Sequence, residues 1–321
     1  MANHLTKQLV SILSIADQEL ILPLQRDNLE PEINMTIYTK TARFDAARSL
    51  TEDEMRASAP SIFAITPHDS RSERFRPIPT IDILRGLATE GFMPVGVKQS
   101  VSRLEGRQDF TKHLIRLRRL DDETKYKVGD NICEILLKNA NDGSSAYELM
   151  AGLFRIRCLN SLVSQTGTLD TIKVRHTGDD IQGKVIEGTY TVLDTAQKLL
   201  AAPQDWSLIN LKPEEREAFA EAAHYLRFAD DEGNTTTPIK PAQLLQTRRP
   251  DDQARDLWTT FNVVQENVIR GGLKGTIYNQ ETGRRQRRVT TRAVNGIDQD
   301  VKLNKALWIL TQSMANSKIA A

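Results

Sequence analysis

The sequence predicts an α+β protein, with a mainly antiparallel sheet and one preceding helix in the middle of the chain and a helical C-terminal region. Two patterns predict this class. Apolar and polar residues alternate over residues 93–163, as in strands with one buried face. From residue 184 onward, apolar residues recur at helical spacing instead. The 321 residues exceed the needs of one small core. We predict an accessory segment, a sheet domain, and a helical region that is separate or packed on the sheet as one domain: residues 1–60, 61–183 and 184–321.

The accessory segment begins with a predicted helix over residues 5–20 and continues into a stretch that Pro23 and Pro31 break. Thr51 is followed three residues later by Glu54. This spacing predicts a capping box at the start of a short helix. We expect the whole segment to act as an arm or as a docking helix.

The sheet domain begins with a short apolar strand, SIFAI, over residues 61–65. A helix follows, for which Thr80 is the predicted N-cap and Gly91 the left-handed stop. The predicted strands then follow in chain order, with one further edge strand at the end: residues 93–103, 110–120, 132–140, 147–163 and 172–178. Residues 139–145, NANDGSS, carry the Asn, Asp and Gly chemistry of a tight turn and predict a hairpin.

The helical region contains two amphipathic helices, a short helix, a long helix and a closing helix: residues 183–202, 212–229, 241–246, 247–272 and 297–315. Pro213 and the two glutamates after it suit a helix start. In the long helix Leu257, Phe261, Val264 and Val268 form a core stripe.

Composition excludes several classes of protein. Two cysteines cannot build a disulfide framework, which predicts a reducing, cytoplasmic location. No apolar run approaches the roughly 20 residues that cross a bilayer, so no membrane association is expected. The 43 basic and 42 acidic residues give a net charge of +1. Binding of nucleic acid therefore requires basic residues that are gathered locally.

The first such gathering is on the strands. Alternation places Lys112, Arg116 and Arg118 on one face of their strand, opposite His113. In FRIRC, Arg155 and Arg157 lie opposite the apolar residues. If both strands bury their apolar rows, the basic residues share an open face that can bind phosphates. The alternative is a solvated face with ordinary salt bridges, because Glu134 and Lys138 lie on the intervening strand.

The second gathering is a Gly- and Arg-rich loop at residues 270–293, where seven basic residues accompany a single acid, Glu281, and a single aromatic, Tyr278. The seven are Arg270, Lys274, Arg284, Arg285, Arg287, Arg288 and Arg292. Such a loop cannot bury its charges, so it projects into solvent or onto a polyanion and is expected to be disordered before binding. A solvated flexible loop without a ligand is the alternative.

Catalytic patterns are weak, and the sequence favours a protein that is not an enzyme. Cys133 and Cys158 fall on apolar strand faces, where cysteine is usually a small buried hydrophobe. His176 has acids nearby, but a turn histidine paired with a carboxylate explains it. No set of carboxylates has convincing nuclease spacing. We therefore predict no catalytic residues, no metal and no cofactor.

Several blocks of the sequence resemble a known family. They are RSERFRPIPTIDILRGLATEGF, FTKHLIRLRR, NANDGSSAYELMAGLFRIRCLNSLV, VIEGTY, DLWTTFNVVQENVIRGGLKG and TTRAVNGIDQDVKLNKALW. Over residues 42–316 the chain is identified as a member of "domain of unknown function 932". These are uncharacterised proteins of prophages and conjugative plasmids, encoded near anti-restriction and single-strand-DNA-handling genes. The family more often has Ser-His where this chain has Ala140 and Asn141. That difference argues against an essential histidine there.

The predicted order of helix, antiparallel sheet and helix also resembles the core of single-strand-annealing proteins, which is an analogy of fold alone. It implies a homo-oligomer that holds a strand by its phosphates. Our first hypothesis is therefore a non-enzymatic protein that binds nucleic acid, single-stranded DNA favoured, in recombination or in establishment of mobile DNA. The alternatives are an anti-defence protein that binds a host restriction or nuclease component and, third, a metal-dependent nuclease.

Overall fold

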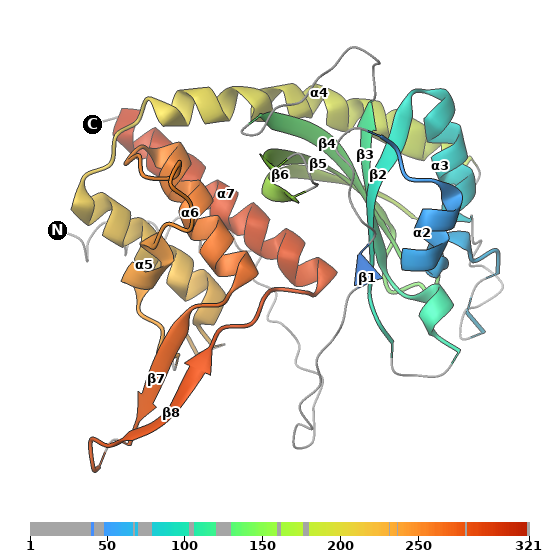
Figure 1. Ribbon diagram of the computed structural model, residues 1–321. Helices are drawn as coiled ribbons and strands as arrows, with labels where there is room; N and C mark the ends of the chain where they lie inside the picture. Colours follow the sequence, from blue (N-terminus) through green and yellow to red (C-terminus); the bar gives the residue numbers. More distant parts are fainter. Residues whose placement is uncertain are drawn as a thin grey trace. The chain divides into compact units, whose positions relative to one another are not determined.

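A six-stranded antiparallel sheet occupies the middle of the chain in the computed structural model (Figure 1). The structure describes residues 40–41, 48–66, 68–69, 79–102, 106–119, 130–158, 162–175, 180–230, 232–235, 237–279 and 281–319. The strands follow one another in the sheet in chain order: β1 Lys40–Thr41, β2 Phe92–Gln99, β3 His113–Arg119, β4 Asn131–Asn139, β5 Tyr147–Cys158 and β6 Leu162–Val174. The predicted α+β class is thus confirmed.

Two strands differ from the sequence prediction. The expected fourth strand, residues 147–163, stops at Cys158, and the chain returns antiparallel to it as β6. Residues 172–174 of the predicted edge strand are therefore the end of the longer strand β6, and residues 176–178 lie outside the described residues. β1 was not predicted, because two residues are too few for a visible alternation.

Two short helices precede the sheet, α2 Glu52–Ser58 and α3 Thr80–Thr89. The predicted capping box at α2 is confirmed, since the Glu54 backbone N–H donates to Thr51 Oγ1 and the Thr51 N–H donates to Glu54 Oε2. Gly91 adopts the predicted left-handed conformation after α3, with φ of 85°. Residues 60–63 form a 3₁₀-helix that begins at Pro60, so the predicted strand at 61–65 was wrong. Thr80 is the first helical residue and does not cap the helix.

The side chains of Ser61 and Thr80 instead join a buried polar cluster, which we call the His113 cluster. Its other members lie on the neighbouring strands and the turn after β4: Gln99, His113, Asn139 and Asn141. The Ser61 hydroxyl donates to Gln99 Oε1 over 2.8 Å, so the proton on His113 Nδ1 must donate to Ser61 Oγ, also over 2.8 Å. Thr80 Oγ1 lies 3.0 Å from His113 Nε2. At Ser61 and Thr80, hydrogen bonding within this buried cluster therefore takes the place of the strand and the N-cap that the local sequence predicted.

The described residues divide into two compact units within α4, between Ala201 and Ala202. The sheet unit comprises the described residues up to Ala201 together with Asn295–Asp298. The helical unit comprises the described residues of 202–294 and 299–321. The remaining helices are α4 Ile181–Ser207, α5 Pro213–Phe228, a 3₁₀-helix Pro241–Leu245, α6 Leu257–Arg270 and α7 Ile297–Ile319. None of the described helices combines the length and the apolar character that a membrane span requires.

An aromatic cluster forms the core of the helical unit. Trp206 packs on Trp308 with ring centroids 4.4 Å apart, and Trp258 and Phe261 of α6 complete the cluster. α6 begins at Leu257, ten residues later than predicted, because Asp256 caps it and accepts a hydrogen bond from the Thr259 N–H. The predicted core stripe of α6 is buried and confirmed.

The predicted flexible loop at residues 270–293 is instead a β-hairpin, formed by β7 Lys274–Tyr278 and β8 Arg285–Thr290. Its turn uses Asn279, whose side-chain oxygen accepts hydrogen bonds from the N–H groups of Glu281 and Thr282. Gly283 supplies a positive φ of 63°. These residues close a hairpin, although the strands lack the alternation of apolar and polar residues that would predict one.

Candidate nucleic-acid interface

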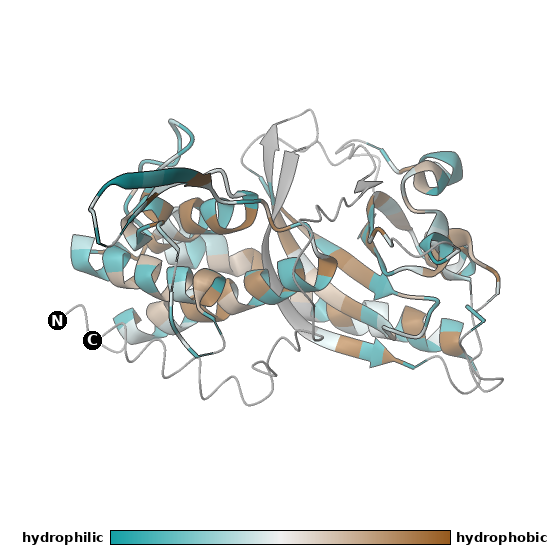
Figure 2. Cartoon of the chain, turned by 90° about the horizontal axis from the view of Figure 1, so that it is seen from below, coloured by the Kyte–Doolittle hydropathy of each residue, from teal (hydrophilic) through white to brown (hydrophobic). Residues whose placement is uncertain are grey.

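The β7–β8 hairpin presents arginine on both of its faces. Directly opposed residues of an antiparallel pair lie on the same face, and Thr276 opposes Arg288 while Ile277 opposes Arg287. Because successive residues of a strand alternate, Arg287 and Arg288 lie on opposite faces. β8 is hydrophilic along most of its length (Figure 2). The hairpin therefore buries neither face and presents its charge on both.

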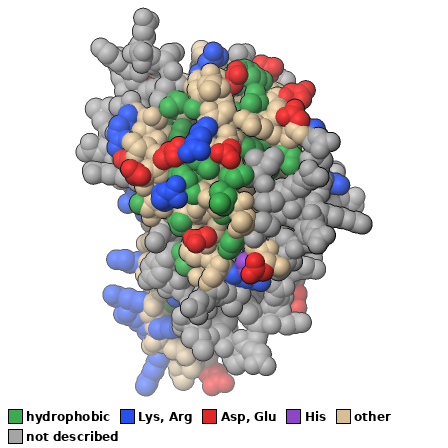
Figure 3. All heavy atoms as spheres, turned by 90° about the vertical axis from the view of Figure 1, so that its right-hand side faces the viewer, with side chains coloured by type: hydrophobic (Ala, Val, Ile, Leu, Met, Phe, Trp, Pro, Cys, Tyr) green, Lys and Arg blue, Asp and Glu red, His purple; other side chains and the backbone are tan. Residues whose placement is uncertain are grey.

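The arginines of the hairpin are exposed and lack acidic partners within the described part of the chain. Four of them are consecutive but for one glutamine: Arg284, Arg285, Arg287 and Arg288. None forms a salt bridge with a described carboxylate, and the one acid of the turn, Glu281, is also exposed. On the face of the sheet unit that carries α2 and α3, by contrast, basic and acidic side chains are mixed (Figure 3), and Arg85 pairs with Glu52 there. We call these four residues the hairpin arginines.

Tyr278 is the exposed aromatic residue of the hairpin. Its side chain is 59% exposed, and it stands opposite Arg285 where the pairing of the strands shifts by one residue. An exposed ring beside guanidinium groups can stack on a nucleobase. The sequence marked Tyr278 as the single aromatic of the segment but did not place it in the site.

The base of the hairpin is held by its backbone. Gly271 has φ of 66°, and a Cβ there would lie 2.6 Å from the carbonyl carbon of Arg292. The Gly272 N–H donates to the Thr291 carbonyl over 2.8 Å, and the Thr291 N–H donates to the Leu273 carbonyl over 2.9 Å. The hairpin thus leaves the end of α6 on a defined path.

The other basic residues of the predicted loop are at this base. Arg270 is exposed, but its Nη1 lies 3.1 Å from Glu266 Oε1, which also pairs with Arg249. Lys274 and Arg292 are exposed, and no salt bridge to a described carboxylate involves them. All seven predicted residues are on or beside one hairpin, and Arg270 is the only one that a described carboxylate partly neutralises.

The predicted open basic face of the sheet was wrong for Arg116 and Arg118. Both guanidinium groups bind the buried carboxylate of Glu134, with Arg116 Nε 2.5 Å from Oε2 and Arg118 Nε 3.0 Å from Oε1. Arg118 is only 2% exposed. Burial lowers the pKa of Arg116, and the charge of Glu134 opposes that change. The salt bridges that the sequence offered as the alternative are therefore present, and these two arginines are excluded from the interface.

Lys112 is also neutralised. Its Nζ lies 2.5 Å from Asp298 Oδ2, and the other oxygen of Asp298 binds Lys138, which pairs with Glu148 as well. The two lysines lower the pKa of Asp298 although burial opposes them. An anionic ligand would have to displace Asp298 to bind Lys112.

Arg155 does not share a face with Arg116. Arg116 pairs with Leu136, which is on the same face of β4 as Ile132, and Ile132 pairs with Phe154. Phe154 is therefore on the face of Arg116, whose Cζ lies 3.9 Å from the centre of the Phe154 ring. Arg155 is the next residue and is on the opposite face. The predicted common face was therefore wrong, because alternation within each strand leaves the register between strands open. The side chain of Arg157 and all of His176 lie outside the described residues.

Two further arginines were missed by the sequence. Arg216 of α5 and Arg255, just before α6, line one pocket although they lie 39 positions apart in the sequence. No local pattern could have linked them. Within the described residues, no group of three or more His, Cys, Asp or Glu side chains could hold a metal ion.

Comparisons with known proteins place the chain in a family. The family model described as "Domain of unknown function (DUF932)" matches residues 67–308. The chain is 40% identical over 279 residues to "UPF0380 protein YafZ" and, over the same length, to "UPF0380 protein YfjQ", both of Escherichia coli (strain K12). Each match covers 85% of this chain and 96% of the relative. No solved structure matches. The resemblance of the sequence blocks is confirmed, and the chain belongs to this family of unknown function.

Proposed function

We propose that the protein binds nucleic acid, with single-stranded DNA favoured, through the β7–β8 hairpin and without catalysing a reaction. The observation that carries the proposal is the exposure of the four hairpin arginines without acidic partners in the described residues. Guanidinium groups bind phosphate oxygens in bidentate fashion, and each contact releases counterions from the polyanion.

Tyr278 supports a single strand as the ligand. Its ring is 59% exposed beside the hairpin arginines, so a base can stack on the ring while its phosphates contact guanidinium groups. A duplex would leave the ring without an unstacked base. Arginine on both faces of the hairpin suits a flexible strand that can wrap around the hairpin.

The wider setting is also a proposal. A role in recombination or in establishment of mobile DNA, as a homo-oligomer, is what the family resemblance and the fold analogy imply, and the low cysteine count favours a cytoplasmic location. Assembly would place several hairpins along one strand and raise the affinity for long strands over short ones.

The test measures fluorescence anisotropy of a labelled single-stranded oligonucleotide at several salt concentrations. The variant Arg284→Gln/Arg285→Gln/Arg287→Gln/Arg288→Gln should bind more weakly, and its salt slope should fall by up to about 3, because each lost phosphate contact removes about 0.7 on single strands. The control, Arg85→Gln/Arg119→Gln, removes exposed arginines of the sheet unit and should leave the slope unchanged.

A second comparison tests the stacking. Tyr278→Ala should weaken single-strand binding by about 1–3 kcal/mol, whereas Tyr278→Phe keeps the ring and the affinity. Equal affinity for duplex and single strand would overturn the strand preference. Oligonucleotide binding that the hairpin variant leaves intact would overturn the proposal, and an anti-defence role would then be the hypothesis to pursue.

A further inference from the structure

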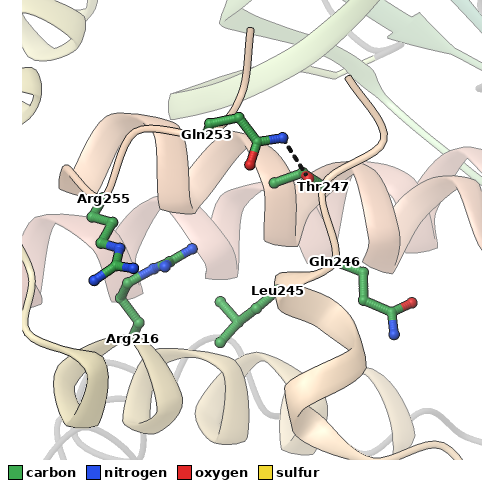
Figure 4. A pocket seen from close by; sticks show the side chains of 6 residues that line it. All are labelled: Arg216, Leu245, Gln246, Thr247, Gln253 and Arg255. Carbon is green, nitrogen blue, oxygen red and sulfur yellow. Dashed lines mark hydrogen bonds between the residues drawn. The ribbon is translucent and has the colours of Figure 1, made fainter. Parts of the chain in front are cut away.

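The helical unit contains a polar pocket of about 590 Å³ (Figure 4). Its lining residues come from α5, from the segment after the 3₁₀-helix and from the segment before α6: Arg216, Leu245, Gln246, Thr247, Gln253 and Arg255. The two charged members of this set are both arginine. Amides and a hydroxyl supply most of the remainder, so the pocket suits a polar, anionic ligand.

Backbone pairing brings the two arginines together. Residues before α5 and before α6 form a short antiparallel bridge, Asn210 to Asp256. The Leu211 N–H donates to the Arg255 carbonyl over 3.0 Å. Arg216 follows on the first turns of α5, and Figure 4 shows its guanidinium group beside that of Arg255. The fold therefore brings the two backbone segments that carry these arginines together.

The charge of this pair is not neutralised within the described residues. Arg216 is half-buried, and its buried Nε has no hydrogen-bond partner there. Burial lowers the pKa of Arg216, the charge of Arg255 lowers it further, and Asp256 opposes both. The Asp256 carboxylate is already engaged, because its oxygens accept from the Thr259 N–H and hydroxyl, each over 2.8 Å. A buried donor without a partner and two adjacent like charges are both unfavourable unless a ligand compensates them.

We propose that this pocket binds the terminal phosphate or diphosphate of a phosphorylated ligand, with Arg216 and Arg255 as its anion-binding residues. Two guanidinium groups can each bind phosphoryl oxygens in bidentate fashion. A single carboxylate cannot satisfy the donors of both groups, so a phosphate suits the pair better. Thr247 and Gln253, joined by a hydrogen bond of 3.0 Å, supply polar groups to the rest of the pocket.

A second pocket of about 280 Å³ shares Gln246 and Thr247 with the first. Arg248 and Lys274 line it, and Lys274 begins β7. The two pockets therefore adjoin at Gln246 and Thr247, and the second one reaches the base of the hairpin. Two sources of phosphate fit this arrangement: a free phosphorylated small molecule, and the phosphorylated end of a strand whose body contacts the hairpin.

The experiment titrates the full-length protein with pyrophosphate by calorimetry at constant ionic strength. Wild type should bind saturably, and Arg216→Gln or Arg255→Gln should each weaken binding by roughly tenfold or more, since hydrogen bonds to charged groups are the strong ones. The matched control, Arg119→Gln, removes an exposed arginine of the sheet unit and should bind as wild type does.

Stability provides an independent readout. Arg216→Met removes a half-buried charge and keeps apolar contacts, so its thermal midpoint should equal or exceed that of wild type while pyrophosphate binding is lost. A midpoint that falls with the loss of binding would mean that Arg216 is structural, and would overturn the assignment. Absent or non-saturable binding by wild type, or equal loss in Arg119→Gln, would also overturn it.

A competition arm identifies the source of the phosphate. A 5′-phosphorylated oligonucleotide that displaces pyrophosphate, when its 5′-hydroxyl counterpart does not, assigns the site to a strand end. Failure of both to compete, with pyrophosphate binding intact, assigns it to a free small molecule. The variant without the hairpin arginines should retain pyrophosphate binding in either case. Failure of the hairpin proposal is thus distinguishable from failure of this one.

Discussion

Glu134 pairs with two arginines at once. Its carboxylate is buried and binds Arg116 on one oxygen and Arg118 on the other. Two guanidinium groups thus share this one carboxylate away from bulk water. Removing the carboxylate would leave both cations without this partner, and desolvation makes that costly.

We expect Glu134→Gln to lower the free energy of unfolding by about 3–5 kcal/mol, because the amide keeps the shape of the side chain and loses its charge. Chemical denaturation followed by circular dichroism measures the change. Glu52→Gln is the control, since Glu52 pairs with Arg85 at an exposed site, and it should lower the free energy of unfolding far less than Glu134→Gln does. Equal losses in the two variants would contradict this account.

At this scale the sequence predicted which residues share a strand face and not which partners they meet. Alternation correctly separated His113 from Arg116, and the register shows both assignments. The same reasoning could not place Arg155 relative to Arg116, because the pairing of two strands depends on the turn between them and on the packing around them. The burial of Arg118 could not be predicted from the sequence for the same reason.

Among the elements, the hairpin depends on two glycines that differ in their surroundings. Gly271 and Gly283 both have φ near +65°, at 66° and 63°. A Cβ at Gly271 would lie 2.6 Å from the backbone carbonyl of Arg292, whereas nothing lies within 4 Å of a Cβ at Gly283. The first glycine permits a close approach of two backbones, and the second only permits a turn.

Gly283→Ala should therefore cost about 1–2 kcal/mol, the strain of a left-handed residue with a side chain. Gly271→Ala should cost more, because the backbone of Arg292 must also move, and it should weaken oligonucleotide binding by displacing the hairpin. Urea denaturation and the anisotropy assay measure the two effects. If Gly271→Ala were no worse than Gly283→Ala, the close approach would have no energetic importance.

Among the element ends, the glycine stop after α3 was predicted correctly from the sequence. Gly91 adopts the predicted left-handed conformation there, whereas α6 begins ten residues later than predicted and ends at Arg270, before Gly271. The hairpin was missed because β8 consists mainly of arginine, so its sequence shows no alternation of apolar and polar residues. The signal that could have found it is the turn, where Asn279 and Gly283 bracket a short polar segment.

For the whole molecule, the distribution of tryptophan separates the two units spectroscopically. All three tryptophans, Trp206, Trp258 and Trp308, lie in the helical unit.

Asp298 lies in the sheet unit although 160 residues separate it from its partner Lys138. No local pattern could have predicted that association, because it depends on the tertiary path of the chain.

We expect Glu134→Gln to shift the unfolding transition seen by far-ultraviolet circular dichroism more than the transition seen by tryptophan emission. The substitution weakens the sheet unit, and the emission reports on the helical unit. Compact units with their own cores can unfold separately. Coincident shifts in both probes would show instead that the two units unfold as one cooperative body.

The His113 cluster has an evolutionary consequence. Ser61, Gln99 and His113 hydrogen-bond to one another in the buried interior, so replacing any one of them removes a hydrogen bond from buried polar groups of its neighbours. Inherited changes at these sites should therefore be epistatic: tolerated in compensating combinations and purged singly. Pairs of such changes, each harmful alone and harmless together, would be the genetic imprint of this buried cluster.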